Sequence, residues 1–400
     1  MIVINDKKDC TGCYACQNIC PRNCITMKND TEGFWYPKVN IEKCNNCGLC
    51  ENVCPIINKK EENNNPKSFA CYNKNGKVRI QSSSGGIFTL IAEEVLGNGG
   101  VVFGAKFDTE FNVVHSYTET KEGLEEYRGS KYTQSQIGDN YKKAKEFVKQ
   151  GRQVLFSGTP CQIAGLKSYL RRDYENLLCI DFICHGVPSP KVWSKYIEFR
   201  ETEARSSAKS ISLRCKNKGW KRYSVSFIFK NNSTYCQTID KDQFMKVYLK
   251  DICLRPSCYQ CEFKTLHRQS DITLADFWGI QNILPEMDDD KGTSLIFVNN
   301  IKGQALLEKI KEQMLYKEVD IETAIKYNPS AIKSPIHNSK RDKFFNEIDE
   351  LSFEQLVKKF CTESVLERTK SKSKIMIYNF LKKVHLLELS KKIISKLNSK

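Results

Sequence analysis

The sequence predicts a mixed α/β protein, of the α/β or α+β class, with a small cysteine-rich domain in front and a helical, basic region at its end. Three observations lead to this expectation: nine of the 19 cysteines lie within the first 54 residues, strand-like and helix-like runs alternate between residues 69 and 330, and the remainder is charged and helical in character. The chain of 400 residues is 40% apolar and 28% charged, as globular proteins are, and is long enough for two or three domains. We expect a first domain at 1–58, a linker at 59–68, a catalytic domain at 69–330 and the C-terminal region at 331–400.

The central segment alternates between strand-like and helix-like patterns. Strands are expected at 101–107, 154–156, 177–183, 210–215, 223–229 and 293–299, and helices at 87–96, 139–150 and 161–172. Residues 154–183 therefore form a strand, a helix and a strand, which favours a βαβ unit with parallel strands. Polar residues from Asn58 to Pro66 mark the linker in front of this segment.

The first domain contains two copies of one cysteine motif, each followed by a proline. The first copy consists of Cys10, Cys13, Cys16 and Cys20, and the second consists of Cys44, Cys47, Cys50 and Cys54. This is the spacing of bacterial two-cluster ferredoxins, in which the fourth cysteine of each copy binds the other cluster. The sequence therefore predicts one [4Fe–4S] cluster on Cys10, Cys13, Cys16 and Cys54, and another on Cys44, Cys47, Cys50 and Cys20. A pair of four-cysteine zinc sites is the alternative.

A second set of cysteines is predicted to meet in the central segment. Cys161 and Cys184 each follow a strand of the expected βαβ unit, so both lie at carboxyl ends of parallel strands and face one crevice. Cys258 and Cys261 supply two more thiols, which completes a third [4Fe–4S] site. A zinc or redox-active site and unconnected thiols are the alternatives. The other cysteines are expected to be small buried residues, namely Cys24, Cys71, Cys179, Cys215, Cys236, Cys253 and Cys361.

Six ordered motifs between residues 69 and 300 carry a family resemblance. They are Ser82-Ser-Ser-Gly-Gly86, Gly129-Ser-Lys-Tyr132, GTPCQIAGLK from Gly158, CHGVPSP from Cys184, RPSCYQC from Arg255 and SDITLADFWGI from Ser270. This part of the chain resembles the coenzyme F-420 hydrogenase/dehydrogenase beta-subunit family, with a ferredoxin unit fused in front. The resemblance implies an enzyme that holds FAD beside an iron–sulfur cluster and exchanges electrons with a deazaflavin coenzyme or another carrier. Ala275 departs from the glycine expected before Asp276.

A flavin site is also favoured by the residues themselves. Ser83, Ser84, Gly85 and Gly86 precede an expected helix, and small residues with free N–H groups at a helix N-terminus suit a pyrophosphate. A helix cap without a ligand is the alternative. In the second motif, Lys131 is expected to hold phosphate and Tyr132 to stack on a ring, although a solvated lysine is as common. Ser130 and Thr159 complete the residues assigned to FAD.

Together these features predict an electron-transfer flavoprotein enzyme. FAD exchanges two electrons as hydride and releases them singly, and the clusters carry the single electrons to or from a protein donor or acceptor. His185 and Lys131 are the catalytic candidates; His185 adjoins Cys184 and would supply a proton or a hydrogen bond, or serve a structural role. Coenzyme F-420 is a candidate substrate. The alternatives are a non-catalytic relay subunit of a hydrogenase or formate dehydrogenase complex, and a ferredoxin-dependent reductase in a cell-surface polysaccharide pathway.

The net charge of +16 is concentrated at the end of the chain. Residues 368–400 contribute ten Lys or Arg and one Glu, or +9, which leaves +7 for the other 367 residues. Without aromatic interleaving in that tail we expect no nucleic-acid partner. The tail helix with Ile377, Phe380, Leu381 and Val384 on one face would pack on its own domain, bind a partner or touch an anionic membrane. No secretion signal is recognised at the N-terminus, so a cytoplasmic location is expected. The oligomeric state is left open.

Overall fold

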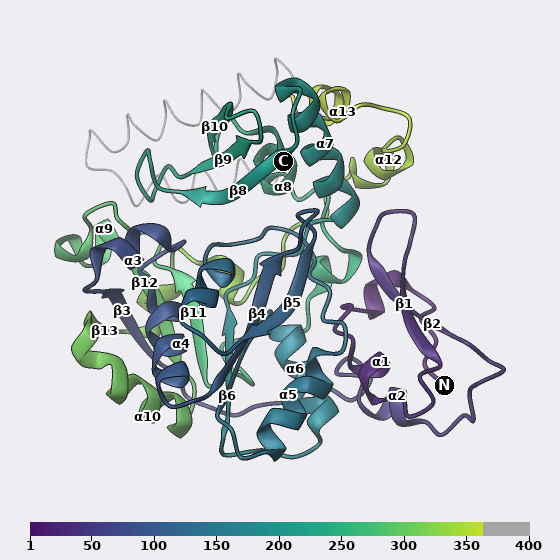
Figure 1. The fold of residues 1–400 in the computed structure, drawn as a ribbon, viewed down its shortest axis with the longest axis horizontal. Helices are drawn as coiled ribbons and strands as arrows, with labels where there is room; N and C mark the ends of the chain where they lie inside the picture. Colours follow the sequence, from purple (N-terminus) through teal and green to yellow (C-terminus); the bar gives the residue numbers. More distant parts are fainter. Residues whose placement is uncertain (363–400) are drawn as a thin grey trace, which may run out of the picture.

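A computed structural model describes residues 1–362 of the chain and has the expected mixed α/β architecture. An eight-stranded sheet lies at the centre, a three-stranded sheet with its helices lies above it in the view of Figure 1, and a two-stranded hairpin from the N-terminal segment lies at its side. Within residues 1–362, no helix combines the length and apolar character needed to cross a membrane.

The central sheet is mixed and has the strand order β13-β3-β12-β11-β7-β6-β4-β5. Its strands are β3 (Lys67–Asn73), β4 (Val101–Phe107), β5 (Val113–Thr118), β6 (Val154–Ser157), β7 (Leu177–Phe182), β11 (Ile272–Asp276), β12 (Ser294–Val298) and β13 (Met314–Val319). The pairs β4–β6, β6–β7 and β7–β11 are parallel, and the other pairs are antiparallel. The parallel strands are buried on both faces, which is why their sequences are nearly continuous apolar runs. The expected βαβ unit is confirmed as β6, α6 (Pro160–Leu170) and β7.

Helices cover both faces of the central sheet. On one face α4 (Ile87–Gly97) and α10 (Ile301–Ile310) bury Leu90, Ile91 and Leu306 against the strands. On the other face α5 (Asn140–Lys149) and α6 pack on Val101, Phe103 and Phe156. The same apolar cluster contains Cys13 and Tyr14 from the N-terminal segment. The N-terminal segment therefore packs on α5 and α6, on this face of the sheet.

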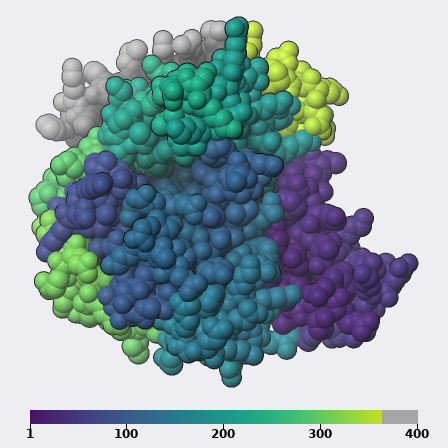
Figure 2. Space-filling view, viewed as in Figure 1, coloured from purple at the N-terminus to yellow at the C-terminus, as the bar shows by residue number. Residues whose placement is uncertain are grey.

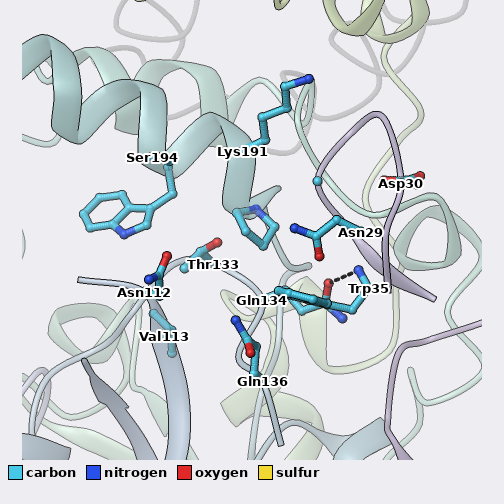
Figure 3. A pocket seen from close by; sticks show the side chains of 13 residues that line it. Asn29, Asp30, Trp35, Asn112, Val113, Thr133, Gln134, Gln136, Lys191 and Ser194 are labelled. Carbon is cyan, nitrogen blue, oxygen red and sulfur yellow. Dashed lines mark hydrogen bonds between the residues drawn. The ribbon is translucent and has the colours of Figure 1, made fainter. Parts of the chain in front are cut away.

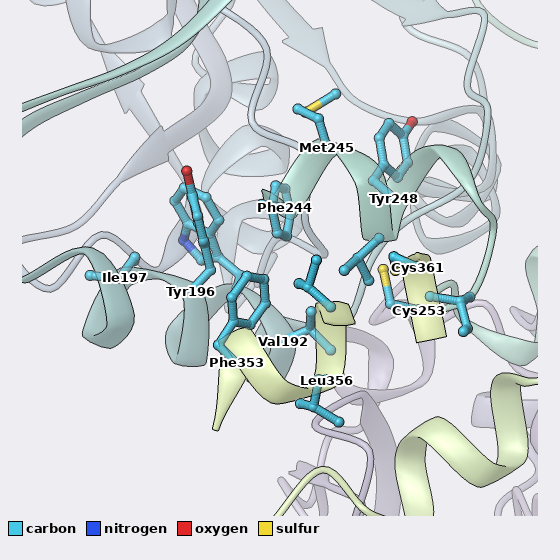
Figure 4. Close-up of a cluster of buried hydrophobic side chains, with 14 of the residues drawn as sticks. Val192, Tyr196, Ile197, Phe244, Met245, Tyr248, Cys253, Phe353, Leu356 and Cys361 are labelled. Carbon is cyan, nitrogen blue, oxygen red and sulfur yellow. The ribbon is translucent and has the colours of Figure 1, made fainter. Parts of the chain in front are cut away.

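A second core lies above the sheet and combines two distant parts of the chain. It is formed by α7 (Pro190–Ala204), β8 (Ala208–Cys215), β9 (Ser224–Phe229), β10 (Thr234–Thr238), α8 (Gln243–Leu249), α12 (Arg341–Asn346) and α13 (Phe353–Cys361). Tyr196 of α7 packs between Phe244 of α8 and Phe353 of α13 in Figure 4, with ring centroids 5.4 and 5.2 Å away. The described helices after residue 330 therefore share a core with residues 190–249 and do not form a unit of their own.

The N-terminal segment is a small unit whose interior is rich in sulfur. Strands β1 (Ile25–Asn29) and β2 (Trp35–Val39) form its hairpin, and α1 (Ala15–Ile19) and α2 (Leu49–Asn52) carry cysteines of the two motifs. Its apolar cluster consists of Ile2, Ile25 and the thiols of Cys20, Cys24 and Cys50. Such a small apolar core needs an inorganic group to replace missing hydrophobic burial.

The structure corrects two expectations about single cysteines. Cys236 is exposed on β10, which lies at the edge of the three-stranded sheet, and Cys215 is only half-buried. An edge strand of a short sheet has one face toward solvent, so its apolar pattern does not guarantee burial. The other five, Cys24, Cys71, Cys179, Cys253 and Cys361, are buried as expected. The predicted apolar face of the tail, from Ile377 to Val384, lies outside the described residues.

Candidate functional site

The first predicted set of N-terminal thiols comes together beside α6. The pKa of Cys13 is raised to about 12, mainly by burial, and the nearby thiols of Cys54 and Cys10 act in the same direction. Burial also raises the pKa of Cys16 well above its usual value, with additional contributions from Cys13, Cys10 and Cys54. Cys10, Cys13, Cys16 and Cys54 are thus mutual neighbours, which is the grouping that the crossed ferredoxin spacing predicts.

The second set lines one small hollow at the molecular surface. Cys20, Cys44, Cys47 and Cys50 all face it, and Cys47 is exposed. The N–H of Ile2 donates to Cys50 Sγ at 3.3 Å, and that of Asn46 donates to Cys44 Sγ at 3.4 Å. Backbone donors of this kind stabilise thiolate sulfur. Within residues 1–362, no three His, Cys, Asp or Glu side chains are close enough to hold a single metal ion.

Four further thiols meet at the carboxyl end of the parallel strands. Cys161 opens α6 directly after β6, Cys184 follows β7, and Cys258 and Cys261 come from a loop that contains the short 3-10 helix Pro256–Gln260. Burial raises the pKa of Cys161 well above its usual value, and charges on Cys261, Cys184 and Cys258 raise it further. We call these four residues the crevice thiols. Their convergence matches the geometry expected from a βαβ unit.

Polar groups surround the crevice thiols. The N–H of Val187 donates to Cys258 Sγ at 3.4 Å, and Thr159 Oγ1 lies 3.1 Å from Cys161 Sγ. The ammonium of Lys264 donates to the carbonyls of Cys184 and of Ser330. Burial raises the pKa of Cys184 to about 11, and the charge of Lys264 acts in the opposite direction. Lys264 was not predicted, since an isolated lysine in a loop carries no sequence signal.

His185 lies next to the crevice thiols and is held from both sides. Its Nε2 is 2.5 Å from Asp251 Oδ1, and its Nδ1 is 3.1 Å from Ser330 Oγ. The ring also meets Tyr248 edge-on, with centroids 5.5 Å apart. Asp251 adopts a left-handed backbone conformation with φ of 55°. Sequence reasoning missed Asp251, which is 66 residues away from its partner.

The serine–glycine loop in front of α4, residues 82–86, forms hydrogen bonds mainly with the start of β12. Ser84 Oγ donates to the carbonyl of Thr293 at 3.0 Å, and the N–H of Gly85 donates to Ser294 Oγ at 2.9 Å. A Cβ at Gly85 would lie 2.6 Å from the carbonyl oxygen of Cys71, so only glycine fits there. Gly86 caps α4 with a left-handed φ of 82°. The donor of Gly85 is therefore already engaged by the protein.

Ser83 and the second motif lie beside a large cleft. The Oγ of Ser83 accepts from the N–H of Ser130 at 2.7 Å, and Ser130 and Lys131 line a cleft of about 1030 Å³ between the end of the β4–β5 hairpin and β8. The cleft lies between the blue central layer and the teal upper layer in Figure 2. Lys131 Nζ donates to the carbonyls of Glu126 and Arg128, and burial lowers its pKa to about 7.

Tyr132, the residue after Lys131, packs in an aromatic cluster. Its ring lies 5.1 Å from that of Tyr248, the residue that also meets His185. Tyr248 is buried and connects the motif at the cleft with the residue beside Cys184. Thr159 is the one FAD candidate that lies with the crevice thiols.

An ion pair between Arg214 and Asp276 contacts the serine–glycine loop in front of α4. Arg214 Nη2 donates to Asp276 Oδ1 at 2.7 Å and to the carbonyl of Ser83 at 2.8 Å. Asp276 also accepts from Trp220 Nε1 at 2.7 Å, and the ring of Trp220 stacks on that of Trp278 at 4.9 Å. Arg214 was not predicted; its partner Asp276 lay in a recognised motif, but the pairing spans 62 residues.

A smaller cavity of about 410 Å³ lies where the N-terminal hairpin meets α7 and β5 (Figure 3). Trp35 of β2 and Gln134 face each other there. The Oε1 of Gln134 accepts from the backbone N–H of Trp35 at 3.3 Å. Polar side chains line the cavity on both sides, among them Asn29, Asn112, Thr133 and Gln136. The contact between the N-terminal unit and the rest of the chain is therefore partly polar.

Comparisons with known proteins give family matches for two parts of the chain. Residues 9–56 match the 4Fe-4S dicluster domain, and residues 151–324 match the family described as the C terminus of the coenzyme F420 hydrogenase/dehydrogenase beta subunit. No curated protein matches the chain. A solved structure of a xenon derivative of the F420-reducing [NiFe] hydrogenase complex from Methanosarcina barkeri contains a similar chain, with 15% identity, a TM-score of 0.46, and coverage of 77% of this chain and 95% of that chain. The chain is therefore an iron–sulfur protein in which a segment that matches the 4Fe-4S dicluster domain precedes a segment related to the coenzyme F420 hydrogenase/dehydrogenase beta subunit.

Proposed function

We propose that the protein is an iron–sulfur flavoprotein oxidoreductase that passes electrons between FAD, three [4Fe–4S] clusters and a redox partner, either a deazaflavin such as coenzyme F-420 or another carrier. The observation that carries this proposal is the convergence of the crevice thiols at the carboxyl ends of β6 and β7. That edge of a parallel sheet is where α/β proteins bind their cofactors.

The three thiol sets fit clusters better than isolated structural roles. Each set brings four thiols together, and the second set lines a hollow at the molecular surface. An unligated buried thiol resists ionisation, as the raised pKa of Cys16 and Cys161 illustrates, and binding of cationic iron would offset that cost. The N-terminal unit, as residues 1–58, would hold two clusters, and the catalytic domain, as residues 69–330, would hold the third.

The cleft beside Ser130 fits FAD. Its volume of about 1030 Å³ is at the upper end of ordinary ligand sites. Lys131 would hold a phosphate, and the hydroxyl of Ser83, which accepts from the N–H and the hydroxyl of Ser130, would keep its own proton for the ligand. FAD, when bound, supplies the exchange between two-electron and one-electron chemistry. Gly85 would act through the shape of the loop, because its own N–H is engaged by Ser294.

Aromatic contacts connect the motif at the cleft with the residue beside Cys184. Tyr132 adjoins Lys131, His185 adjoins Cys184, and both rings touch Tyr248. Asp251 and Ser330 fix the orientation of the His185 imidazole. In this arrangement His185 would hold a proton beside the cofactors, and Lys131 would hold the flavin in place.

The iron and flavin content of anaerobically purified protein tests the proposal. Three clusters require about twelve irons per chain and the N-terminal unit alone about eight. About twelve irons with one FAD would support the proposal. About eight irons without flavin, after reconstitution with both, would contradict it and favour the alternative of a non-catalytic electron-relay subunit in a larger complex. Turnover of a deazaflavin or of reduced ferredoxin by the isolated chain would separate the enzyme from such a relay.

A further inference from the structure

Arg255 lies at the junction between the N-terminal unit and the crevice thiols. Its side chain is fully buried. Nε donates to the carbonyl of Cys10 at 2.8 Å, Nη2 to the carbonyl of Trp35 at 3.1 Å, and Nη1 to Gln134 Oε1 at 3.2 Å. The guanidinium also lies over the ring of Tyr36, 4.1 Å from its centroid.

The charge of Arg255 has no carboxylate partner among residues 1–362. Other buried arginines of the chain are neutralised: Arg341 pairs with Glu32, and Arg214 pairs with Asp276. Arg255 forms no such pair and is surrounded by carbonyls, an amide and aromatic rings. A buried cation without an anion is costly, so a compensating negative charge is required nearby.

Two thiol sets lie within reach of this charge. Gly12, in the loop between Cys10 and Cys13, is so near that a Cβ built there would lie 3.1 Å from the guanidinium carbon. On the other side, Arg255 begins the short loop that carries Cys258, and the N–H of Cys258 donates to the carbonyl of Arg255 at 2.9 Å. The N–H of Arg255 donates to the carbonyl of Val187 at 3.0 Å, and the N–H of Val187 donates to Cys258 Sγ at 3.4 Å.

We propose that Arg255 is a shared buried counter-charge that raises the reduction potentials of the clusters held by Cys10, Cys13, Cys16 and Cys54 and by the crevice thiols. This inference rests on the proposed function. Each four-thiolate cluster becomes more negative by one charge when it accepts an electron from its neighbour, which is oxidised in the same step. A fixed cation favours the more negative form and therefore raises the potential. Arg255 acts as a positioning residue, because its charge acts on the thiolates and takes no part in bond making.

Redox titrations followed by electron paramagnetic resonance test this without any turnover assay. The Arg255→Gln variant removes the charge and keeps one donor, whereas Arg255→Lys keeps the charge. We expect Arg255→Gln to lower the reduction equilibrium constants of both affected clusters at least tenfold, or 59 mV for a one-electron couple. Arg255→Lys should remain within threefold of the wild type, and the surface cluster of Cys47 should change least.

A second variant neutralises the charge without removing the arginine. Gln134→Glu is nearly isosteric and places a carboxylate on Nη1 of Arg255, so it should lower the same two potentials. If the Arg255→Gln protein does not retain its clusters, the potentials of Gln134→Glu alone test the role of the Arg255 charge. The control is the double variant Arg341→Gln with Glu32→Gln, which removes a buried guanidinium together with its carboxylate and leaves the net charge unchanged. Its potentials should equal those of the wild type.

The outcomes separate this inference from the proposed function. If wild-type protein shows all three clusters but Gln134→Glu and every cluster-retaining Arg255→Gln sample keep wild-type potentials, the role of Arg255 is refuted and the proposed function stands. An equal shift in the control pair would also refute it. If the wild type lacks the crevice cluster after reconstitution, the proposed function is contradicted, and the shared role of Arg255 is refuted with it.

Discussion

Cys13 packs directly against Gly165 on the inner face of α6. A Cβ at Gly165 would lie 2.9 Å from Cys13 Cβ and 3.1 Å from its Sγ, so the absence of a side chain permits the contact. The same position is 3.1 Å from Tyr141 Oη, which donates to the carbonyl of Gln162 at 2.7 Å. Gly165 is one helical turn beyond Cys161, or about 6 Å along the axis. The first N-terminal thiol set and the crevice thiols are therefore bridged by a single turn of α6.

Gly165→Ala should weaken the attachment of the N-terminal unit. The added methyl group would overpack the contact with Cys13, which typically costs about 1–3 kcal/mol, against a gain of about 0.5–1 kcal/mol in helix propensity. We expect a lower midpoint of chemical unfolding and faster loss of iron to a chelator. Gly97→Ala at the end of α4 is the control, because a Cβ there meets nothing within 4 Å and should not reduce stability. Equal effects of both substitutions would argue against a specific contact.

Cys184→Ser should remove one cluster and leave two. The crevice site would lose one of its four thiolates, so iron should fall from about twelve to about eight per chain while the N-terminal signals persist. Iron analysis and electron paramagnetic resonance of anaerobic protein measure this. Cys236→Ser provides the matched control, because that thiol is exposed on β10 and lies in none of the three sets. Retention of about twelve irons in Cys184→Ser would show that Cys184 is not a ligand.

FAD affinity should fall as the pH rises through neutrality. Burial lowers the pKa of Lys131 to about 7, so the side chain is mostly cationic at pH 6 and mostly neutral at pH 8. A phosphate contact would be lost with the charge, which predicts up to about tenfold weaker binding at pH 8. Fluorescence titration with FAD at both pH values checks this. Lys131→Met should bind weakly and without pH dependence, whereas Lys209→Met, at another part of the cleft, should keep the wild-type trend. A pH trend that survives in Lys131→Met would assign the titration to another group.

Arg341→Met should strongly destabilise the contact between the hairpin and the second core. Arg341 forms a double hydrogen bond with Glu32 at 2.6 and 3.0 Å, and both side chains are largely buried. Removal of one partner leaves a buried charge and typically costs about 3–5 kcal/mol. Urea unfolding measures the change. Arg222→Met, which breaks an ion pair with Asp240 on the surface, should leave the midpoint almost unchanged. Similar midpoints for the two variants would contradict the buried role.

Much of the molecule follows from local sequence patterns. The motifs at Cys10 and Cys44 have spacings of two and three residues, so the short loop of each copy presents its first three thiols together, and the fourth thiol of each copy is assigned to the other set by the ferredoxin spacing. The apolar runs at 154–156 and 177–182 are strands because they are buried on both faces, and the helix between them makes them parallel. From these local facts the crevice position of Cys161 and Cys184 could be anticipated.

The tertiary structure alone decided the contacts between residues far apart in the chain. Arg255 reaches Cys10 across 245 residues, and His185 reaches Asp251 across 66. The donor of Gly85 was expected to be free, yet Ser294 of β12 engages it, and α12 and α13 were assigned to a separate region although they complete the core of α7 and α8. Hydrophobic periodicity determines the type of an element and the face it buries. Which element meets that face depends on the packing of the whole chain, and this is why Arg255 and Gly165, although both lie in recognised motifs, do not reveal their contact partners in the sequence.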